Sequence, residues 1–217
     1  MDVKSVLFLL LVAVALSQAQ KKCCFPDQYE SMDGQITGLV QSGQGTVQLA
    51  SAQIAFDYTN RRLGEIVTVQ GSMYQEVFDY NKGVLYVINL TMKTCQKVPL
   101  PTMQMQHCVP SNATYVGSFY AGDHKLNADT FSYSINEGSA VGNVTLSVSK
   151  DNCIPFSQTF VGSSGGNQML TVAGFVNYTP GIQDPSKYFT IPNYCPAFLT
   201  PEPKEGLGPA FTMKFPL

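Results

Sequence analysis

The sequence predicts an all-β protein built from antiparallel strands, and three observations support this. Apolar and polar residues alternate with a period of two in several segments, each long enough for one strand. Turn signals rich in glycine, asparagine and aspartate separate these segments at short, regular intervals. No long segment has the period of an amphipathic helix. About ten strands in this rhythm indicate a sandwich, a barrel or a curved sheet.

The first predicted strands lie between residues 51 and 90. In residues 51–58, Ala52, Ile54, Phe56 and Tyr58 share one face, and residues 65–69 return as the partner strand after a turn. Residues 74–80 and 84–90 are predicted to form a hairpin, because Gly83 between them can adopt the positive φ that a tight turn requires.

The second half of the chain repeats the pattern. We expect strands at residues 115–120, 130–135 and 143–149, with Asn143 on a polar face. Residues 156–161 and 168–178 are predicted to form another hairpin around a Gly/Ser turn. Residues 184–188 are predicted to form one short turn of helix.

Both ends of the chain differ from this β region. Residues 1–19 have the features of a secretory signal peptide: a positive start at Lys4, an apolar run too short to span a bilayer, and a cleavage site expected after Ala19. We expect a single domain over residues 20–195. Residues 196–217 contain five prolines and no strand pattern, which predicts a flexible tail.

Six cysteines are expected to form a disulfide framework in an oxidising compartment: Cys23, Cys24, Cys95, Cys108, Cys153 and Cys195. Six cysteines allow 15 connectivities, and these residues alone do not choose among them. Neighbours such as Cys23 and Cys24 rarely satisfy bridge geometry with each other, so each is expected to reach a distant partner. A zinc site is disfavoured because no Cys-x-x-Cys pair is present.

Glycosylation sequons and the charge balance bear on location and partners. Sequons of the Asn-x-Ser/Thr type occur at Asn89, Asn112, Asn143 and Asn177, and behind a signal peptide they predict a glycoprotein. The formal net charge is −2 and no basic patch is present, which argues against nucleic acid as a partner. No second apolar stretch is long enough to cross a membrane, so we expect no membrane-spanning segment.

The sharpest enzymatic motif is the Gly-x-Ser-x-Gly match at residues 162–166, which is typical of α/β-hydrolases. That chemistry requires a strand, a strained turn and a helix, followed by an acid and a histidine. Here the motif lies between two predicted strands, and both histidines, His107 and His124, lie upstream. We therefore predict a hairpin turn rather than a nucleophile, and a protein that is not an enzyme.

A calcium site is the one metal site the residues leave open. Asp123, Asp129, Asp151 and Asp184 lie near predicted strand ends, where they could converge. No EF-hand loop is present. The simpler interpretation is that all four are solvated turn residues.

Aromatic side chains inside the predicted strands suggest a binding role. A sheet that curves without closing leaves a cavity that such residues can line, although each of them can equally fill a core. A lipid tail in such a cavity would gain about 0.8 kcal/mol per buried methylene. The candidate pocket residues are Phe56, Tyr58, Phe78, Tyr80, Tyr86, Phe119, Phe131, Tyr133 and Phe175.

An ordered series of short motifs resembles the ependymin family. The resemblance covers residues 23–195, and the order and spacing of the motifs make it specific. The motifs are Cys23-Cys24-Phe25-Pro26-Asp27-Gln28-Tyr29-Glu30, Phe56-Asp57-Tyr58 with Arg61-Arg62, Phe78-Asp79-Tyr80 with Gly83-Val84-Leu85-Tyr86, Thr94-Cys95-Gln96-Lys97, Lys150-Asp151-Asn152-Cys153-Ile154-Pro155 and Gly181-Ile182-Gln183-Asp184-Pro185-Ser186.

The resemblance implies a fold and two roles. It implies two stacked antiparallel sheets that form a half-open barrel, similar to bacterial lipoprotein carriers, with a deep apolar pocket for a lipid or another hydrophobic ligand. It implies a secreted or lysosomal glycoprotein that forms homodimers. The alternative role is a calcium-binding component of the extracellular matrix or of cell adhesion, including shell matrix. A lipocalin is disfavoured, because that family normally has a tryptophan near its start and this chain has none.

The resemblance also implies a disulfide pairing. It pairs Cys23 with Cys153 and Cys95 with Cys195, which leaves Cys24 and Cys108 as the third pair. Each of the first two bridges closes a loop of roughly 100 residues, a constraint worth about 4–5 kcal/mol in the chain-entropy model. The chain lacks the vertebrate cysteines near residues 70–75 and in the C-terminal tail, so the tail is expected to be untethered.

Overall fold

A computed structural model describes residues 22–100, 104–137 and 140–200. These residues form one antiparallel sheet of eleven strands and one short helix. The elements are β1 (Gln28–Gln41), β2 (Gln44–Asp57), β3 (Arg62–Val69), β4 (Ser72–Asp79), β5 (Val84–Asn89), β6 (Thr94–Pro99), β7 (Thr114–Ala121), β8 (Leu126–Glu137), β9 (Ala140–Ser149), β10 (Pro155–Ser164), β11 (Asn167–Pro180) and α2 (Pro185–Phe189).

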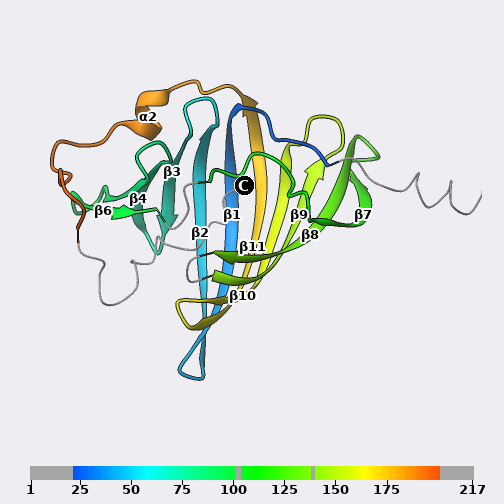
Figure 1. Ribbon diagram of the computed structural model, residues 1–217, viewed down its shortest axis with the longest axis horizontal. Coiled ribbons are helices and arrows are strands. Elements are labelled where there is room, and N and C mark those ends of the chain that lie inside the picture. Colours follow the sequence, from blue (N-terminus) through cyan, green and yellow to red (C-terminus); the bar gives the residue numbers. More distant parts are fainter. Residues whose placement is uncertain (1–21, 101–103, 138–139, 201–217) are drawn as a thin grey trace, which may run out of the picture.

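Two meanders make up the sheet, and β1 joins them. The strand order is β6-β5-β4-β3-β2-β1-β11-β10-β9-β8-β7, so β1 pairs with β2 on one side and with β11 on the other. Figure 1 shows that the sheet curves strongly and stays open, because its edge strands β6 and β7 lie far apart. The expected all-β, half-open fold is confirmed. The two expected sheets are two halves of one continuous sheet.

The inner face of the curved sheet carries the core. Fully buried side chains from both halves meet in one cluster, which includes Phe56 of β2, Phe131 of β8 and Leu146 of β9. Residues 104–113, which precede β7, cover this face, and Val109 among them is buried in the same cluster. Figure 1 is viewed from this side, and the segment crosses in front of the central strands.

The N-terminal residues are tied to this covering segment. Phe25 donates its backbone N–H to the carbonyl of His107, and Val109 donates to the carbonyl of Cys23. The Cys24–Cys108 disulfide reinforces this short pairing, and Cys23–Cys153 links it to the turn before β10. With Cys95–Cys195, the structure contains the two bridges that the family resemblance implied and the third pair that they left.

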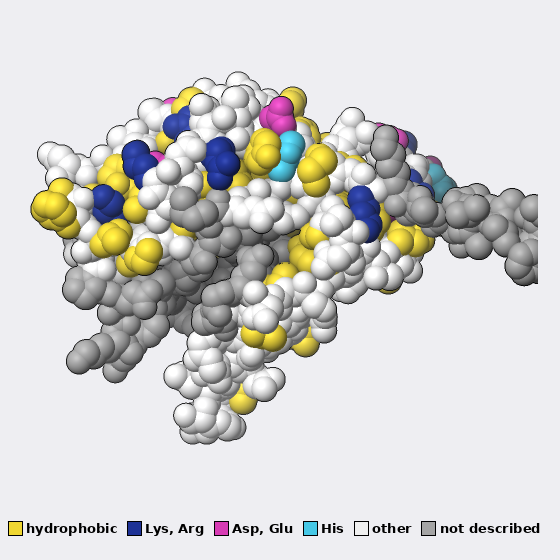
Figure 2. Space-filling model, viewed as in Figure 1, with side chains coloured by type: hydrophobic (Ala, Val, Ile, Leu, Met, Phe, Trp, Pro, Cys, Tyr) yellow, Lys and Arg dark blue, Asp and Glu magenta, His cyan; other side chains and the backbone are white. Residues whose placement is uncertain are grey.

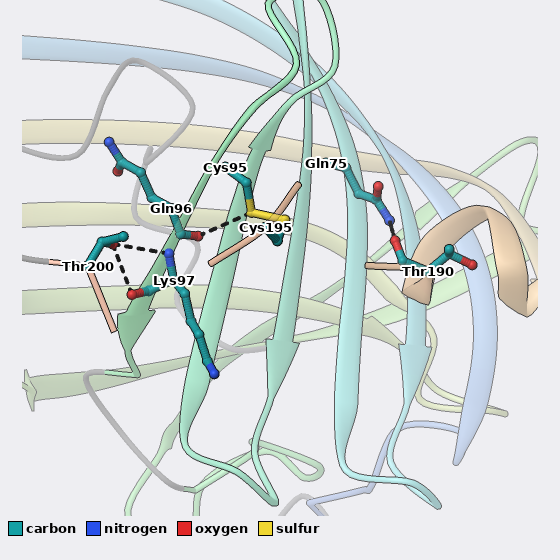
Figure 3. The surroundings of a disulfide bond; sticks show 7 residues. All are labelled: Gln75, Cys95, Gln96, Lys97, Thr190, Cys195 and Thr200. Atoms are coloured by element: carbon teal, nitrogen blue, oxygen red, sulfur yellow. Dashed lines mark hydrogen bonds between the residues drawn. A yellow bond between two sulfur atoms is a disulfide. The ribbon is translucent and has the colours of Figure 1, made fainter. Parts of the chain in front are cut away.

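The C-terminal segment covers part of the outer face. Helix α2 lies against β3, where Gly64 leaves room for it: a Cβ on Gly64 would lie 2.8 Å from the Cβ of Tyr188. Gln75 of β4 donates its side-chain N–H to the carbonyl of Tyr188 (2.9 Å), and the Arg62 guanidinium lies over the Phe189 ring. The segment around Cys195 then crosses towards β6, where the disulfide to Cys95 holds it (Figure 3).

The sequence located most of the strands but missed three pieces. The hairpin at Gly83, the later strands and the short helix lie where they were predicted. Strands β1 and β6 and the first half of β2 were not predicted. Of the predicted tail, the structure describes residues 196–200, and Thr200 hydrogen-bonds to the backbone of Lys97 in β6 (Figure 3). The predicted signal peptide, residues 1–19, lies outside the described residues.

A pair of facing glycines brings β9 and β10 unusually close beneath an aromatic ring. Gly142 and Gly162 are directly opposite each other in the ladder. A Cβ on Gly162 would lie 2.2 Å from the Val141 carbonyl oxygen and 2.6 Å from the Phe160 ring. Neither backbone nor ring can move aside cheaply, so this position accepts only glycine.

We predict that Gly162→Ala destabilises the protein by about 1–3 kcal/mol, the usual cost of overpacking. Gly174→Ala in β11 is the matched control, because nothing lies within 4 Å of the added methyl group. Urea denaturation of both variants measures the difference. A Gly162→Ala protein as stable as the Gly174→Ala protein would contradict the close approach of β9 and β10.

A buried carboxylate fixes the turn between β2 and β3. Asp57 is completely buried, and it accepts hydrogen bonds from Gln28 (2.7 Å), from Asn60 and from the Nε of Arg62 (2.7 Å). Burial acts to raise the pKa of Asp57, but the hydrogen bonds from Gln28, Asn60 and Arg62 outweigh it and lower the pKa below its usual value. Asp57 is therefore charged in the folded protein at neutral pH.

We predict that Asp57→Asn lowers the free energy of unfolding at pH 7 by about 1.5–3 kcal/mol, because it removes charge-assisted hydrogen bonds. The folded pKa is below the unfolded value of about 3.9, so this contribution is present above that pH and is lost as the pH falls through the folded pKa. Denaturant titrations at pH 7, 5 and 3 should show the wild type and the variant converging at the lowest pH. A constant difference down to pH 3 would contradict the assignment.

Candidate functional site

A pocket lies where β10 and β11 separate. Their ladder ends at the pair Ser157–Gly174, whereas β11 continues to Pro180 with β1 as its partner. The gap forms a pocket of about 260 Å³ between the end of β11 and the turn that precedes β10. It is lined by Tyr29, Ser31, Leu126, Ser149, Ile154, Pro155, Phe156, Phe175, Val176, Asn177 and Tyr178.

Two irregularities in the sheet create this gap. The register between β1 and β11 shifts between Glu30 and Met32, and Asn177 in the opposing stretch of β11 has a positive φ of 55°. The register between β9 and β10 shifts between Pro155 and Ser157. β-Bulges of this kind bend a strand and redirect its side chains. The Cys23–Cys153 disulfide holds the turn directly before Ile154, which fixes one wall of the pocket.

The pocket wall is apolar and carries two buried hydroxyl groups that have no hydrogen-bond partner among the described residues. They are the hydroxyl groups of Tyr29 and Ser31, whose side chains are buried. Burial, followed by the nearby Tyr178 and Glu65, raises the pKa of Tyr29 far above its usual range. Burial also raises the pKa of Tyr178. Both phenols are therefore neutral hydrogen-bond donors at physiological pH.

One of the nine aromatic residues predicted to line a pocket, Phe175, lines this one. Phe119 is adjacent, since its ring contacts that of Phe156 at a centroid distance of 5.4 Å. The other seven lie elsewhere. Phe56, Tyr80 and Phe131 are buried in the core, and Phe78 and Tyr133 pack against it.

The two remaining predicted aromatic residues, Tyr58 and Tyr86, contact groups outside the pocket. Tyr58 is 36 % exposed and stacks on His107, and Tyr86 lies under the Lys97 ammonium group. That any of the nine contacts a ligand stays a prediction. Sequence reasoning missed the aromatic residues Tyr29, Phe156 and Tyr178 and all the non-aromatic lining residues, because the bulges that gather them have no sequence pattern of their own.

The other motifs do not build a site in the described part of the chain. The Gly-x-Ser-x-Gly match forms the hairpin turn between β10 and β11, with Gly165 and Gly166 at positive φ, as the sequence predicted. Asp184 caps α2, whereas Asp129 pairs with Lys150 at the opposite end of the sheet. No group of three carboxylates suited to a metal occurs among the described residues.

One cluster of possible metal ligands exists among the described residues, formed by Cys24, His107 and Cys108. Both sulfur atoms are engaged in the Cys24–Cys108 disulfide, so they are not thiolate ligands. His107 lies 3.0 Å from Asp27 through its Nε2 atom and stacks on Tyr58. This cluster is a structural contact between the N-terminus and the covering segment.

No helix in the described residues is long and apolar enough to cross a membrane.

The chain is similar to proteins of known sequence over most of its length. The model of the Ependymin family matches residues 68–195. Ependymin-related protein 1 of Haliotis asinina is 33 % identical over 189 residues, covering 81 % of this chain and 90 % of that protein. Ependymin-related protein 2 of the same species is 31 % identical with the same coverage. Development-specific protein LVN1.2 of Lytechinus variegatus is 28 % identical and covers 68 % of this chain and 86 % of that protein.

Solved structures offer more distant likenesses. An uncharacterised conserved protein from Thermus thermophilus matches with a TM-score of 0.48 and 12 % identity, covering 75 % of this chain and 86 % of that one. A LolA superfamily protein from Nitrosomonas europaea matches with a TM-score of 0.33 and 10 % identity, covering 76 % and 90 %. The sequence relationships are the decisive ones: by the family model and by its similarity to the Haliotis proteins, this chain belongs to the ependymin family.

Proposed function

We propose that this protein is a secreted carrier that holds a small hydrophobic ligand in the pocket between β10 and β11. The observation that carries the proposal is the apolar pocket itself. It contains two buried hydroxyl groups, those of Tyr29 and Ser31, that have no hydrogen-bond partner among the described residues. Ligand pockets are typically apolar with a few placed polar groups that fix orientation. A binding role also fits the hairpin conformation of the only nucleophile-elbow match, residues 162–166.

The size of the pocket sets the class of ligand. Its volume of about 260 Å³ is just below the 300–1,000 Å³ typical of pockets for drug-sized ligands. A segment of about six methylenes would supply roughly 5 kcal/mol of burial, before the entropy of association is subtracted. The Tyr29 and Ser31 hydroxyls favour a ligand that also has a hydrogen-bonding group. We therefore propose a medium-length acyl chain or a similar molecule with one polar end.

Secretion and glycosylation belong to the same proposal. All six cysteines are paired, which suits an oxidising compartment. Asn112, Asn143 and Asn177 are exposed and can carry glycans. Asn89 is 5 % exposed and its side-chain oxygen accepts the N–H of Met92, so we expect no glycan there. Calcium binding, matrix association and a lysosomal destination stay predictions.

Ligand entry can be followed with a tryptophan reporter, because the natural chain contains no tryptophan. We predict that Phe156→Trp, in the pocket wall, shows a saturable change in fluorescence when decanoic acid is added. Phe198→Trp is the control, since Phe198 is 85 % exposed and lies outside the pocket. Equal responses of the two variants, or no response of Phe156→Trp, would rule out binding at this site.

The contribution of the Tyr29 hydroxyl group to ligand binding can be separated from the contribution of its ring to packing. Tyr29→Phe keeps the stacking on Phe56 (centroid distance 5.0 Å) and removes only the hydroxyl. In the Phe156→Trp background, we predict that it weakens decanol binding about 5-fold, the equivalent of one hydrogen bond of about 1 kcal/mol. Binding of 1-bromodecane, which has no hydroxyl, should be unchanged. Equal losses for the two ligands would indicate a packing effect and contradict the proposed polar contact.

A further inference from the structure

One glycosylation sequon lies in the wall of the ligand pocket. Asn177 begins the sequon Asn177-Tyr178-Thr179 near the end of β11, and Asn177 is itself a pocket-lining residue. The other two exposed sequon residues, Asn112 and Asn143, do not line the pocket. An N-glycan on Asn177 would therefore be attached to the pocket wall itself.

The pocket has a buried end and an exposed end. Tyr29 and Ser31 are 1 and 6 % exposed, so their hydroxyl groups lie at the buried end. Among the lining residues, only Val176 and Asn177 are exposed. The pocket therefore opens to solvent at these two residues, and a ligand that enters or leaves there passes both of them.

The side chain of Asn177 lies on the outer side of the sheet. Val176 is directly opposite Met32 and both are exposed, whereas the preceding residue, Phe175, is buried on the inner side. The Nδ2 atom of Asn177, which carries the sugar in an N-glycan, donates to the Sδ atom of Met32 (3.3 Å). The outer side is opposite to the view in Figure 2, in which Lys and Arg side chains are interspersed with hydrophobic ones.

A bulge in the backbone places Asn177 at the opening. In a regular strand successive side chains alternate between the two faces, so Val176 and Asn177 would not both be exposed on one side. The register between β1 and β11 shifts at this point, between Glu30 and Met32. Asn177 has a φ of 55°, a left-handed conformation that asparagine adopts more readily than most residues. The attachment point is thus fixed by the same irregularity that opens the pocket.

We propose that the N-glycan on Asn177 lies across the opening of the pocket and slows the entry and release of the ligand. This role rests on the proposed carrier function. Met32 and Val176 are 37 and 57 % exposed beside the attachment point, where the first sugars can cover them. N-glycans are bulky, so a ligand that passes the opening must first displace the sugars. Like a protein lid, such a cover sets the rate of exchange.

The glycan can be removed without altering the pocket wall. Thr179 is exposed and does not line the pocket. Thr179→Ala abolishes the sequon and keeps the Asn177 side chain, whereas Thr179→Ser keeps the sequon. Thr114→Ala removes the sequon of Asn112 instead. Thr114 begins β7, and the pocket residue Leu126 pairs with the opposite end of that strand, so this variant controls for loss of a remote glycan.

The test measures ligand release from protein secreted by eukaryotic cells, with Phe156→Trp as the reporter background. Mass spectrometry of peptides reports whether Asn177 carries a glycan. Each protein is loaded with decanol and mixed with excess cyclodextrin, which traps the released ligand, while tryptophan fluorescence is recorded. We expect Thr179→Ala to release decanol about 5-fold faster than the parent protein. Thr179→Ser and Thr114→Ala should release it at the rate of the parent.

Three outcomes would overturn the proposal. They are an unoccupied Asn177 in the parent protein, equal release rates for Thr179→Ala and Thr179→Ser, and an equal acceleration by Thr114→Ala. The second outcome would mean that the glycan projects into solvent. Absence of saturable decanol binding in every protein would contradict the carrier function itself, and the role of the glycan with it. If thermal melting shows that Thr179→Ala is not folded, Asn177→Gly replaces it, because glycine accepts the positive φ.

Discussion

The pairing of β1 on both of its edges is the constraint on which the rest of the structure depends. Strands β2 to β6 and strands β7 to β11 are each a simple meander, and only the ladder between β1 and β11 makes them one sheet. This ladder joins segments more than 100 residues apart, so its loop closure is expensive. The Cys23–Cys153 bridge, with a sequence separation of 130, lowers that cost by joining the segment before β1 to the turn before β10, the strand that pairs with β11.

The candidate site forms where the β1–β11 ladder continues beyond the end of the β10–β11 ladder. β11 continues along β1 after β10 has ended, and bulges on both sides turn the side chains into the gap. Phe56, Phe131 and Leu146 pack together in the core cluster on the inner face of the described sheet. The pocket among the described residues comes from a local separation of two strands, and the Cys23–Cys153 disulfide holds the turn that forms one of its walls.

The sequence could predict the fold class because most strands bury an apolar face, but β1 reverses that pattern. Its buried face carries Tyr29 and then Ser31, Asp33, Gln35 and Thr37, whereas Met32, Ile36 and Val40 are exposed. The inward polar groups interact within the structure, as Thr37 does with Thr171 (3.2 Å). The apolar residues of β1 and of the first half of β2 point to the exposed outer side of the sheet. An alternation rule that places apolar residues inside cannot identify such a strand, and it cannot locate a pocket made by bulges.

The most direct test of this account is photolabelling with a medium-chain fatty acid that carries a diazirine at its apolar end, followed by peptide mapping. The account predicts labels on residues 149–156 and 175–178, the two walls of the gap between β10 and β11. An excess of unlabelled fatty acid should abolish them. Saturable labelling confined to the exposed outer side of β1, for example at Ile36, or labelling that excess ligand does not reduce, would contradict it.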